Sequence, residues 1–149
     1  MSTIAKSHRP EAERAAEWCL REKFGCVVTR RALRTKFAKV DFFAADVIGK
    51  MVDGANVYAQ ATAGQDECVR LRRRKLEKVP WHTDERVLVL QLVERQSPVN
   101  ARSKEWFFRV HEYSGAFRSN DERVKRDWMD VCEAIPVPRE WFKAWRDEQ

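Results

Sequence analysis

The sequence predicts an α/β domain in which a mixed central sheet is flanked by helices, and three patterns predict it. Residues 10–24 carry apolar side chains at helical spacing. Two apolar runs, 46–51 and 57–61, are separated by a short turn, which is typical of an antiparallel hairpin. A second helical pattern over 65–78 precedes a nearly continuous valine and leucine run at 86–94, which is typical of a strand covered on both faces.

The first helix is bounded by Pro10 near its first turn and by Gly25 after its end. Glu13 and Glu17 fall on the shoulder of its apolar stripe. Carboxylates at such positions usually solvate the rim of a core, and less often point into a site on the adjoining sheet. A β-prone run at 26–29 follows the glycine, so a strand is expected there.

A basic segment, residues 30–39, comes next and has no clean period, which predicts a loop close to the start of the hairpin. Such a loop fits phosphate positioning, and a plain solvated loop fits equally well. The cations of this segment are Arg30, Arg31, Arg34, Lys36 and Lys39.

The hairpin turns at Asp53-Gly54, because glycine supplies the positive φ that a tight turn requires. Asp46 opens the first strand and Gln60 lies near the end of the second. Antiparallel pairing would place both side chains at the same edge of the sheet, facing each other.

The second helix carries acids in its first turn and bases toward its end, which suits the helix dipole. A helical wheel groups Cys68, Val69, Leu71, Leu76 and Val79 on one apolar face, with Arg70, Arg73, Arg74 and Glu77 pointing away. Arg72 and Lys75 project into the apolar arc. Either their heads reach solvent along the rim, or one of them reaches the polar edge of the hairpin.

The remainder of the chain predicts a strand at 106–113 and two helices, at 119–134 and 139–147. His111 has no partner nearby in the sequence and is interpreted as a packed or surface histidine rather than a catalytic one. Trp141 and Trp145 in the last helix are expected to cover a core.

The composition predicts one domain, residues 1–149, with its core at about 10–94 and an extension at 95–149. The net charge is +6, with a pI near 9.4, which favours a polyanion such as nucleic acid or a solvated basic face. The four cysteines lack metal-ligand spacing and are interpreted as buried thiols in a reducing compartment. Neither a signal peptide nor a run of about 18 apolar residues is found, so a cytoplasmic protein without a membrane partner is expected.

The αβββαβ order, with Asp46 in the second strand and Gln60-Ala61-Thr62 in the third, resembles the PD-(D/E)XK nuclease superfamily. This superfamily includes restriction-type endonucleases and archaeal-type Holliday junction resolvases. The resemblance covers residues 10–94 and implies a restriction endonuclease-like core with a C-terminal strand and helices. It also implies Mg²⁺ (or Mn²⁺) held by Asp46, the Gln60 side chain and the Ala61 carbonyl, with Thr62 at the position of the family's lysine.

Thr62 departs from the family because it carries no positive charge. The missing cation is expected from the second helix, with Lys75 preferred over Arg72 because a compact ammonium acts as a point charge. Glu13 is the candidate for an additional first-helix carboxylate, as in similar resolvases. The candidate catalytic residues are therefore Asp46, Gln60, Thr62, Lys75 and Glu13.

Three functions remain open on the sequence. The first is a metal-dependent DNA endonuclease or resolvase-like enzyme, acting on branched or double-stranded DNA, with a homodimer as a further option. The second is an inactive nuclease-fold protein that binds nucleic acid, and the third is a small protein-interaction module. The candidate nucleic-acid-binding residues are Arg30, Arg31, Arg34, Lys36, Lys39, Arg70, Arg72, Arg73 and Arg74.

Overall fold

The computed structural model describes residues 9–34, 39–40, 44–63, 65–81, 84–96, 98–99, 104–114, 127–130 and 134–138. Along the chain the elements are α1 (Arg9–Glu22), β1 (Cys26–Arg31), β2 (Leu33–Arg34), β3 (Lys39–Val40), β4 (Val47–Met51), β5 (Asn56–Thr62), α2 (Asp66–Glu77), β6 (Arg86–Gln96), β7 (Lys104–Ser114), β8 (Asp127–Asp130) and β9 (Ile135–Val137). The α/β class predicted from the sequence is confirmed.

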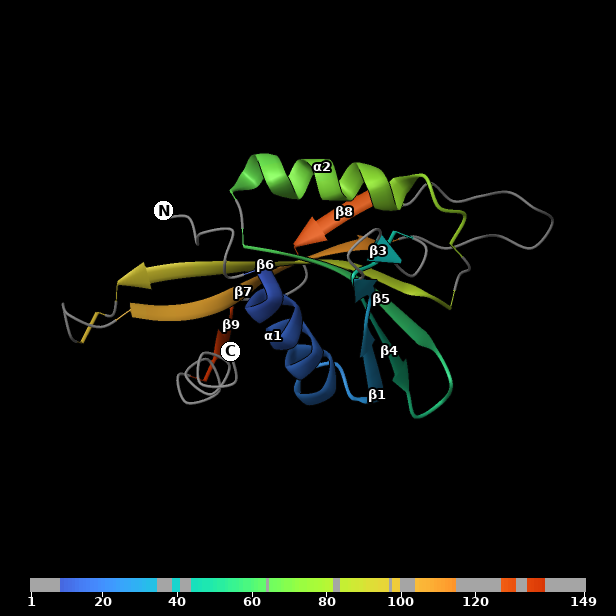
Figure 1. Ribbon diagram of the computed structural model, residues 1–149, viewed down its shortest axis with the longest axis horizontal. Coiled ribbons are helices and arrows are strands. Elements are labelled where there is room, and N and C mark those ends of the chain that lie inside the picture. Colours follow the sequence, from blue (N-terminus) through green and yellow to red (C-terminus); the bar gives the residue numbers. More distant parts are fainter. Residues whose placement is uncertain are drawn as a thin grey trace.

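The main sheet is mixed and has the strand order β1-β4-β5-β6-β7-β8, with β9 also paired to β7 (Figure 1). Strands β4 and β5 pair antiparallel, which confirms the predicted hairpin, and β1 also pairs antiparallel with β4. Strands β5 and β6 pair parallel, and α2 is the crossover between them. A parallel pair needs such a crossover because its second strand must start again at the same end of the sheet.

The two helices cover opposite faces of the sheet (Figure 1). Side chains alternate along each strand, so β5 sends Val57, Ala59 and Ala61 into the core beneath α1. Tyr58 points the other way, into a separate apolar cluster with residues of α2. Strand β6 is buried on both faces from Val87 to Val93, which confirms the strand predicted from its apolar run.

Helix α1 lies close to the sheet because its buried face is made of small side chains. Ala12, Ala15 and Ala16 are almost fully buried. Below them, a side-chain carbon added to Gly49 would lie 2.6 Å from the Cys26 sulfur, so β4 needs a glycine where it faces β1.

Helix α2 presents a different face to the sheet than the wheel predicted. Val69 and Leu76 are buried and Arg72 and Arg73 are half-buried, which follows the i, i+3, i+4, i+7 spacing of one helix face. The inward prediction was wrong for Cys68, Leu71 and Lys75, which are exposed, and the outward prediction was wrong for Arg73. Two arginines occupy inward positions because the sheet offers them polar partners, and an apolar wheel does not detect this.

The structure corrects two further predictions. The segment 30–39 is not all loop, because β1 continues to Arg31 and residues 33–34 pair with 39–40. The helix predicted to reach residue 134 is wrong at 127–130, which form β8 against β7. An available strand edge outweighs local helical preference there.

Some residues singled out in the sequence lie outside the part of the chain that the structure describes. They are Lys36, Cys132, Trp141 and Trp145.

Candidate functional site: a polar centre beneath helix α2

Asp46 lies just before β4 and is held by backbone hydrogen bonds on both sides. Its N–H donates to the Ala59 carbonyl on β5 at 2.9 Å, and its own carbonyl accepts from the Ala32 N–H at 2.6 Å. The residue is 1 % exposed. Asp46 is therefore fixed at the end of the β4–β5 ladder, beside the strand that carries Gln60.

Gln60 is also 1 % exposed and points to the α2 side of β5. Its side-chain N–H donates to the Ala44 carbonyl. Ala44 has a φ of 67°, in the left-handed region that an alanine rarely adopts. Backbone strain of this kind persists where the surroundings enforce it, and here it accompanies a hydrogen bond to a buried amide.

Arg72 of α2 completes the group. Its Nη1 donates to Asp46 Oδ2 at 3.2 Å and to Gln60 Oε1, and its side chain is 17 % exposed. Asp46 Oδ2 also accepts the Ala61 N–H at 3.2 Å. We refer to Asp46, Gln60 and Arg72 as the polar centre.

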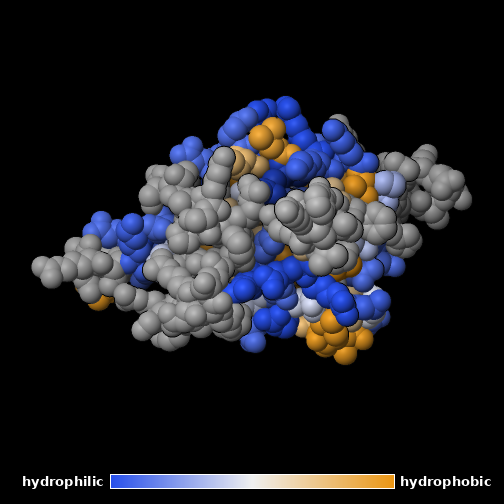
Figure 2. Space-filling model, in the orientation of Figure 1, coloured by the Kyte–Doolittle hydropathy of each residue, from blue (hydrophilic) through white to orange (hydrophobic). Residues whose placement is uncertain are grey.

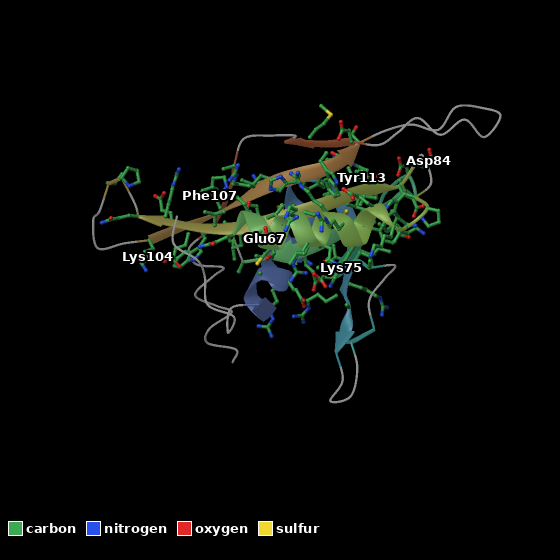
Figure 3. The ribbon with its side chains drawn as sticks, turned by 90° about the horizontal axis from the view of Figure 1, so that it is seen from above. Glu67, Lys75, Asp84, Lys104, Phe107 and Tyr113 are labelled. Carbon is green, nitrogen blue, oxygen red and sulfur yellow. The ribbon has the colours of Figure 1, made fainter. Side chains whose placement is uncertain are left out.

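The polar centre contains the inward cation that the sequence led us to expect, and that cation is Arg72 rather than the preferred Lys75. Lys75 is exposed, and Figure 3 looks down on the helix that carries it. A guanidinium suits this position because its nitrogens can donate to two acceptors at once.

The other two candidate catalytic residues, Thr62 and Glu13, lie on opposite sides of the sheet. Thr62 is 4 % exposed on the same face of β5 as Gln60, opposite Gln91 of β6 in the register. Glu13 is also 4 % exposed, but it belongs to α1, which covers the other face of the sheet. Thr62 therefore adjoins the polar centre, and Glu13 comes from the opposite layer.

A second group of polar side chains beneath α2 was missed by the sequence reasoning. An Arg73 nitrogen lies 2.6 Å from His111 Nδ1, and His111 Nε2 lies 3.4 Å from Gln91 Oε1. Gln91 in turn donates to Asp66 at 3.4 Å. The one available signal was Gln91, a buried amide inside an otherwise apolar strand, because buried polar groups require partners.

Aromatic side chains border this second group. The Arg73 guanidinium lies 5.1 Å from the centre of the Trp128 ring, which stacks on Tyr113 at 4.7 Å. Trp128 also donates to Glu77 at 2.7 Å. Strand β8 therefore contacts α2 through Trp128 as well as pairing with β7.

The candidate nucleic-acid-binding cations fall into different environments. Arg31 contacts Glu17 of α1 at 2.7 Å, so it ties β1 to that helix. Arg70 pairs with Glu67, and the hydrogen bond from Arg70 lowers the pKa of that carboxyl. Arg30 and Arg74 are exposed. The side chains of Arg34 and Lys39 lie outside the described part of the structure.

The polar centre does not fit the divalent metal that the resemblance implies. Magnesium binds oxygen ligands, commonly carboxylates together with waters. Here the Asp46 carboxylate already accepts from Arg72 and Ala61, and the Gln60 oxygen accepts from Arg72. Within the described residues, no group of three or more histidine, cysteine, aspartate or glutamate side chains could hold a metal ion.

Among the described residues, no helix is long and apolar enough to cross a membrane. Cys19 and Cys26 are buried, as the sequence predicted, whereas Cys68 is exposed, so that prediction was wrong for Cys68. No protein-family model, curated protein or solved structure matches the chain.

Proposed function

We propose that this protein binds nucleic acid through the exposed cations of α2, on a restriction endonuclease-like core whose buried acid is neutralised by Arg72. The observation that carries the proposal is the division of cations on α2 and just after it. Arg72 and Arg73 face the sheet, whereas Arg74, Lys75 and Lys78 are exposed. Hydrophilic residues gather over α2 in Figure 2.

The positive net charge of the chain supports a polyanion as its binding partner. The chain carries a net charge of +6, and exposed Lys and Arg side chains bind phosphates with release of counterions. A pocket of about 580 Å³ at the hairpin turn is instead lined by Asp53, Asp84 and Glu85. The acids of this pocket disfavour approach of a polyanion to the hairpin end, whereas the exposed cations toward the C-terminal end of α2 favour it there.

The order of elements supports the proposed core. Helix α1, strands β1, β4 and β5, helix α2 and strand β6 follow one another as αβββαβ, with β2 and β3 inserted after β1. Arg72 of α2 contacts both Asp46, just before β4, and Gln60 of β5. Both features are those that the resemblance to the PD-(D/E)XK superfamily implies.

The test is binding of fluorescently labelled duplex, single-stranded and four-way-junction DNA, followed by anisotropy over a series of salt concentrations. Each phosphate contact contributes about 0.9 to the slope of log K against log salt on duplex DNA. The variant Arg74→Gln/Lys75→Gln should therefore bind more weakly and lower that slope by about 2.

The matched control is Lys23→Gln/Lys50→Gln, which removes the same charge from two exposed lysines outside α2. Its slope should stay close to that of the wild type. Equal losses in the two double variants would place the contact elsewhere. Failure of the wild type to bind any of the three DNAs at low salt would favour the protein-interaction alternative.

A metal-dependent DNA endonuclease or resolvase-like enzyme is the second candidate. The approach of an α2 cation to Asp46 and Gln60 favours this candidate. The side-chain oxygens of Asp46 and Gln60 already accept hydrogen bonds from Arg72, which weighs against it. The test is incubation of linear, nicked and branched DNA with Mg²⁺ or Mn²⁺. Cleavage that disappears in Asp46→Asn, with circular dichroism showing that the variant is folded, would establish this candidate, whereas binding without cleavage would support the first.

A further inference from the structure

We propose that the Arg72 guanidinium is the resident cation of the polar centre and stands in place of the divalent ion that the resemblance implies. The proposal concerns the buried centre alone and is independent of whether α2 binds nucleic acid. It rests on which oxygens Arg72 contacts, on the balance of charge, and on the element that delivers the cation.

Arg72 contacts the same oxygens that a metal would need. Its Nη1 lies 3.2 Å from Asp46 Oδ2 and donates to Gln60 Oε1 as well. The resemblance assigns both oxygens to the metal. A divalent ion at this place would have to displace the guanidinium from both contacts.

The charges of Asp46 and Arg72 already balance. Asp46 is 1 % exposed and contributes one negative charge, which Arg72 matches with one positive charge. Adding a divalent ion would leave an excess of two positive charges where solvent screens little, and such a state is strongly disfavoured. The electrostatic free energy therefore disfavours binding of a divalent ion at the polar centre as long as Arg72 stays in place.

The cation is also part of the fold. Arg72 lies on the inward face of α2 between Val69 and Leu76, which are both buried, so packing of the helix positions the guanidinium. A metal ion binds or leaves with its concentration in solution, whereas Arg72 is covalently part of α2 and stays within reach of the centre while the helix is docked. The docked helix therefore supplies a cation whose presence does not depend on the composition of the solution.

The experiment rebuilds a metal site by removing the resident cation. In Gln60→Glu/Arg72→Ala, two carboxylates face each other without a guanidinium, and this pair should bind Mn²⁺. The control Gln60→Glu/Arg70→Ala removes an exposed arginine from the same helix and keeps Arg72. Free Mn²⁺ is measured by electron paramagnetic resonance during titration of the full chain, with circular dichroism to monitor folding.

The rebuilt variant should bind one equivalent of Mn²⁺ at least about tenfold more tightly than the wild type and the control, a factor typical of changes around metal sites. A folded rebuilt variant that binds no more tightly than the control would overturn the proposal. So would binding of one equivalent by the wild type that is lost in Asp46→Asn.

The melting temperature of the wild type gives a measurement that does not depend on the rebuilt variant. A resident guanidinium predicts a melting temperature that millimolar Mn²⁺ or Mg²⁺ does not raise, because a ligand stabilises only the state that it binds. A rise with either ion that disappears in Asp46→Asn would contradict the proposal, even if the rebuilt variant did not fold.

Discussion

Helices α1 and α2 cover the two faces of one sheet by different physical means. The inward face of α1 is closely packed and mostly apolar, with Ala15, Ala16 and Leu20 fully buried, although the buried Glu13 also belongs to this helix. The inward face of α2 combines two buried aliphatic side chains with Arg72 and Arg73, which reach buried polar groups on the strands. The two layers therefore differ in what holds each helix against the sheet.

The two layers should respond differently to substitution. Apolar packing is non-directional and tolerates changes in chemistry better than changes in volume. A buried polar network is stable only while every member keeps its partner, because an unpaired buried charge is costly. We expect the α1 layer to be sensitive to side-chain size and the α2 layer to be sensitive to the loss of single partners.

The largest expected effect is at the polar centre. Asp46→Ala should lower the free energy of unfolding by about 3–5 kcal/mol, because it leaves Arg72 with its charge uncompensated beneath α2. Urea denaturation measures the change. The comparison is Lys104→Ala in the more exposed Lys104–Glu94 pair, which should cost less than about 1 kcal/mol.

A double-mutant cycle measures the interaction energy between Asp46 and Arg72 separately from the effect of each single substitution. Asp46→Ala/Arg72→Ala should be less destabilised than the sum of the two single variants, because neither buried charge is then left alone. Additive losses would show that Asp46 and Arg72 act independently. The α2 layer would then not have the expected sensitivity to the loss of single partners.

The α1 layer should respond to volume. Ala16→Leu should destabilise by about 1–3 kcal/mol, because Ala16 has no exposed surface and the added carbons have no space beneath the helix. The control Glu22→Leu adds a large apolar side chain at the exposed end of the same helix and should stay within about 0.5 kcal/mol. Similar losses in both variants would indicate an effect on helix formation rather than packing.

A smaller change of opposite sign is expected beside the polar centre. Ala44→Gly should raise the free energy of unfolding by about 1 kcal/mol, because glycine adopts a φ of 67° without strain. Ala55→Gly, in the hairpin turn, serves as the control and should give a loss instead. A destabilised Ala44→Gly variant would mean that the left-handed backbone at this position is not strained.

Alkaline pH should modestly lower the free energy of unfolding, through Cys26 in the α1 layer and Tyr58 in the α2 layer. Burial raises the pKa of the Cys26 thiol from its ordinary value of 9.0, and burial with a hydrogen bond to Glu85 raises that of Tyr58 from 10.0. The unfolded chain then loses each proton first. The stability from each group is complete below its ordinary pKa and is lost as pH rises through the raised one.

Unfolding free energies measured from pH 8 to 11 check this expectation. Cys26→Ala should remove the part of the decline that begins near 9.0, and Tyr58→Phe the part that begins near 10.0. An unchanged alkaline decline in both variants would assign it to other groups.

Most of the core elements could be predicted from the sequence because their signals are local. The hairpin follows from its glycine turn and the long buried strand from its apolar run, and both are confirmed at their pairing. Asp46 and Gln60 were found for the same reason, since hairpin register alone places them together. Strand β8 was missed because its formation depends on the edge of β7, which local preference does not report.

The partners of the buried cations could not be predicted. A helical wheel identifies which positions share a face, but it treats every arginine as polar and so turned Arg73 outward. What holds Arg73 inward is His111, 38 positions further along the chain, whose imidazole is brought beneath α2 by the pairing of β7 with β6. Contacts of this kind exist only once the sheet is assembled.

The crossover of α2 between two parallel strands has a kinetic consequence. The Arg72–Asp46 contact spans 26 positions and requires α2 to dock on the β4–β5 hairpin. The Arg73–His111 contact spans 38 positions and also requires β7 to pair with β6. Contacts that form after the transition state affect the rate of unfolding more than the rate of folding. Because these contacts join distant parts of the chain, we expect the polar layer beneath α2 to slow unfolding more than it speeds folding.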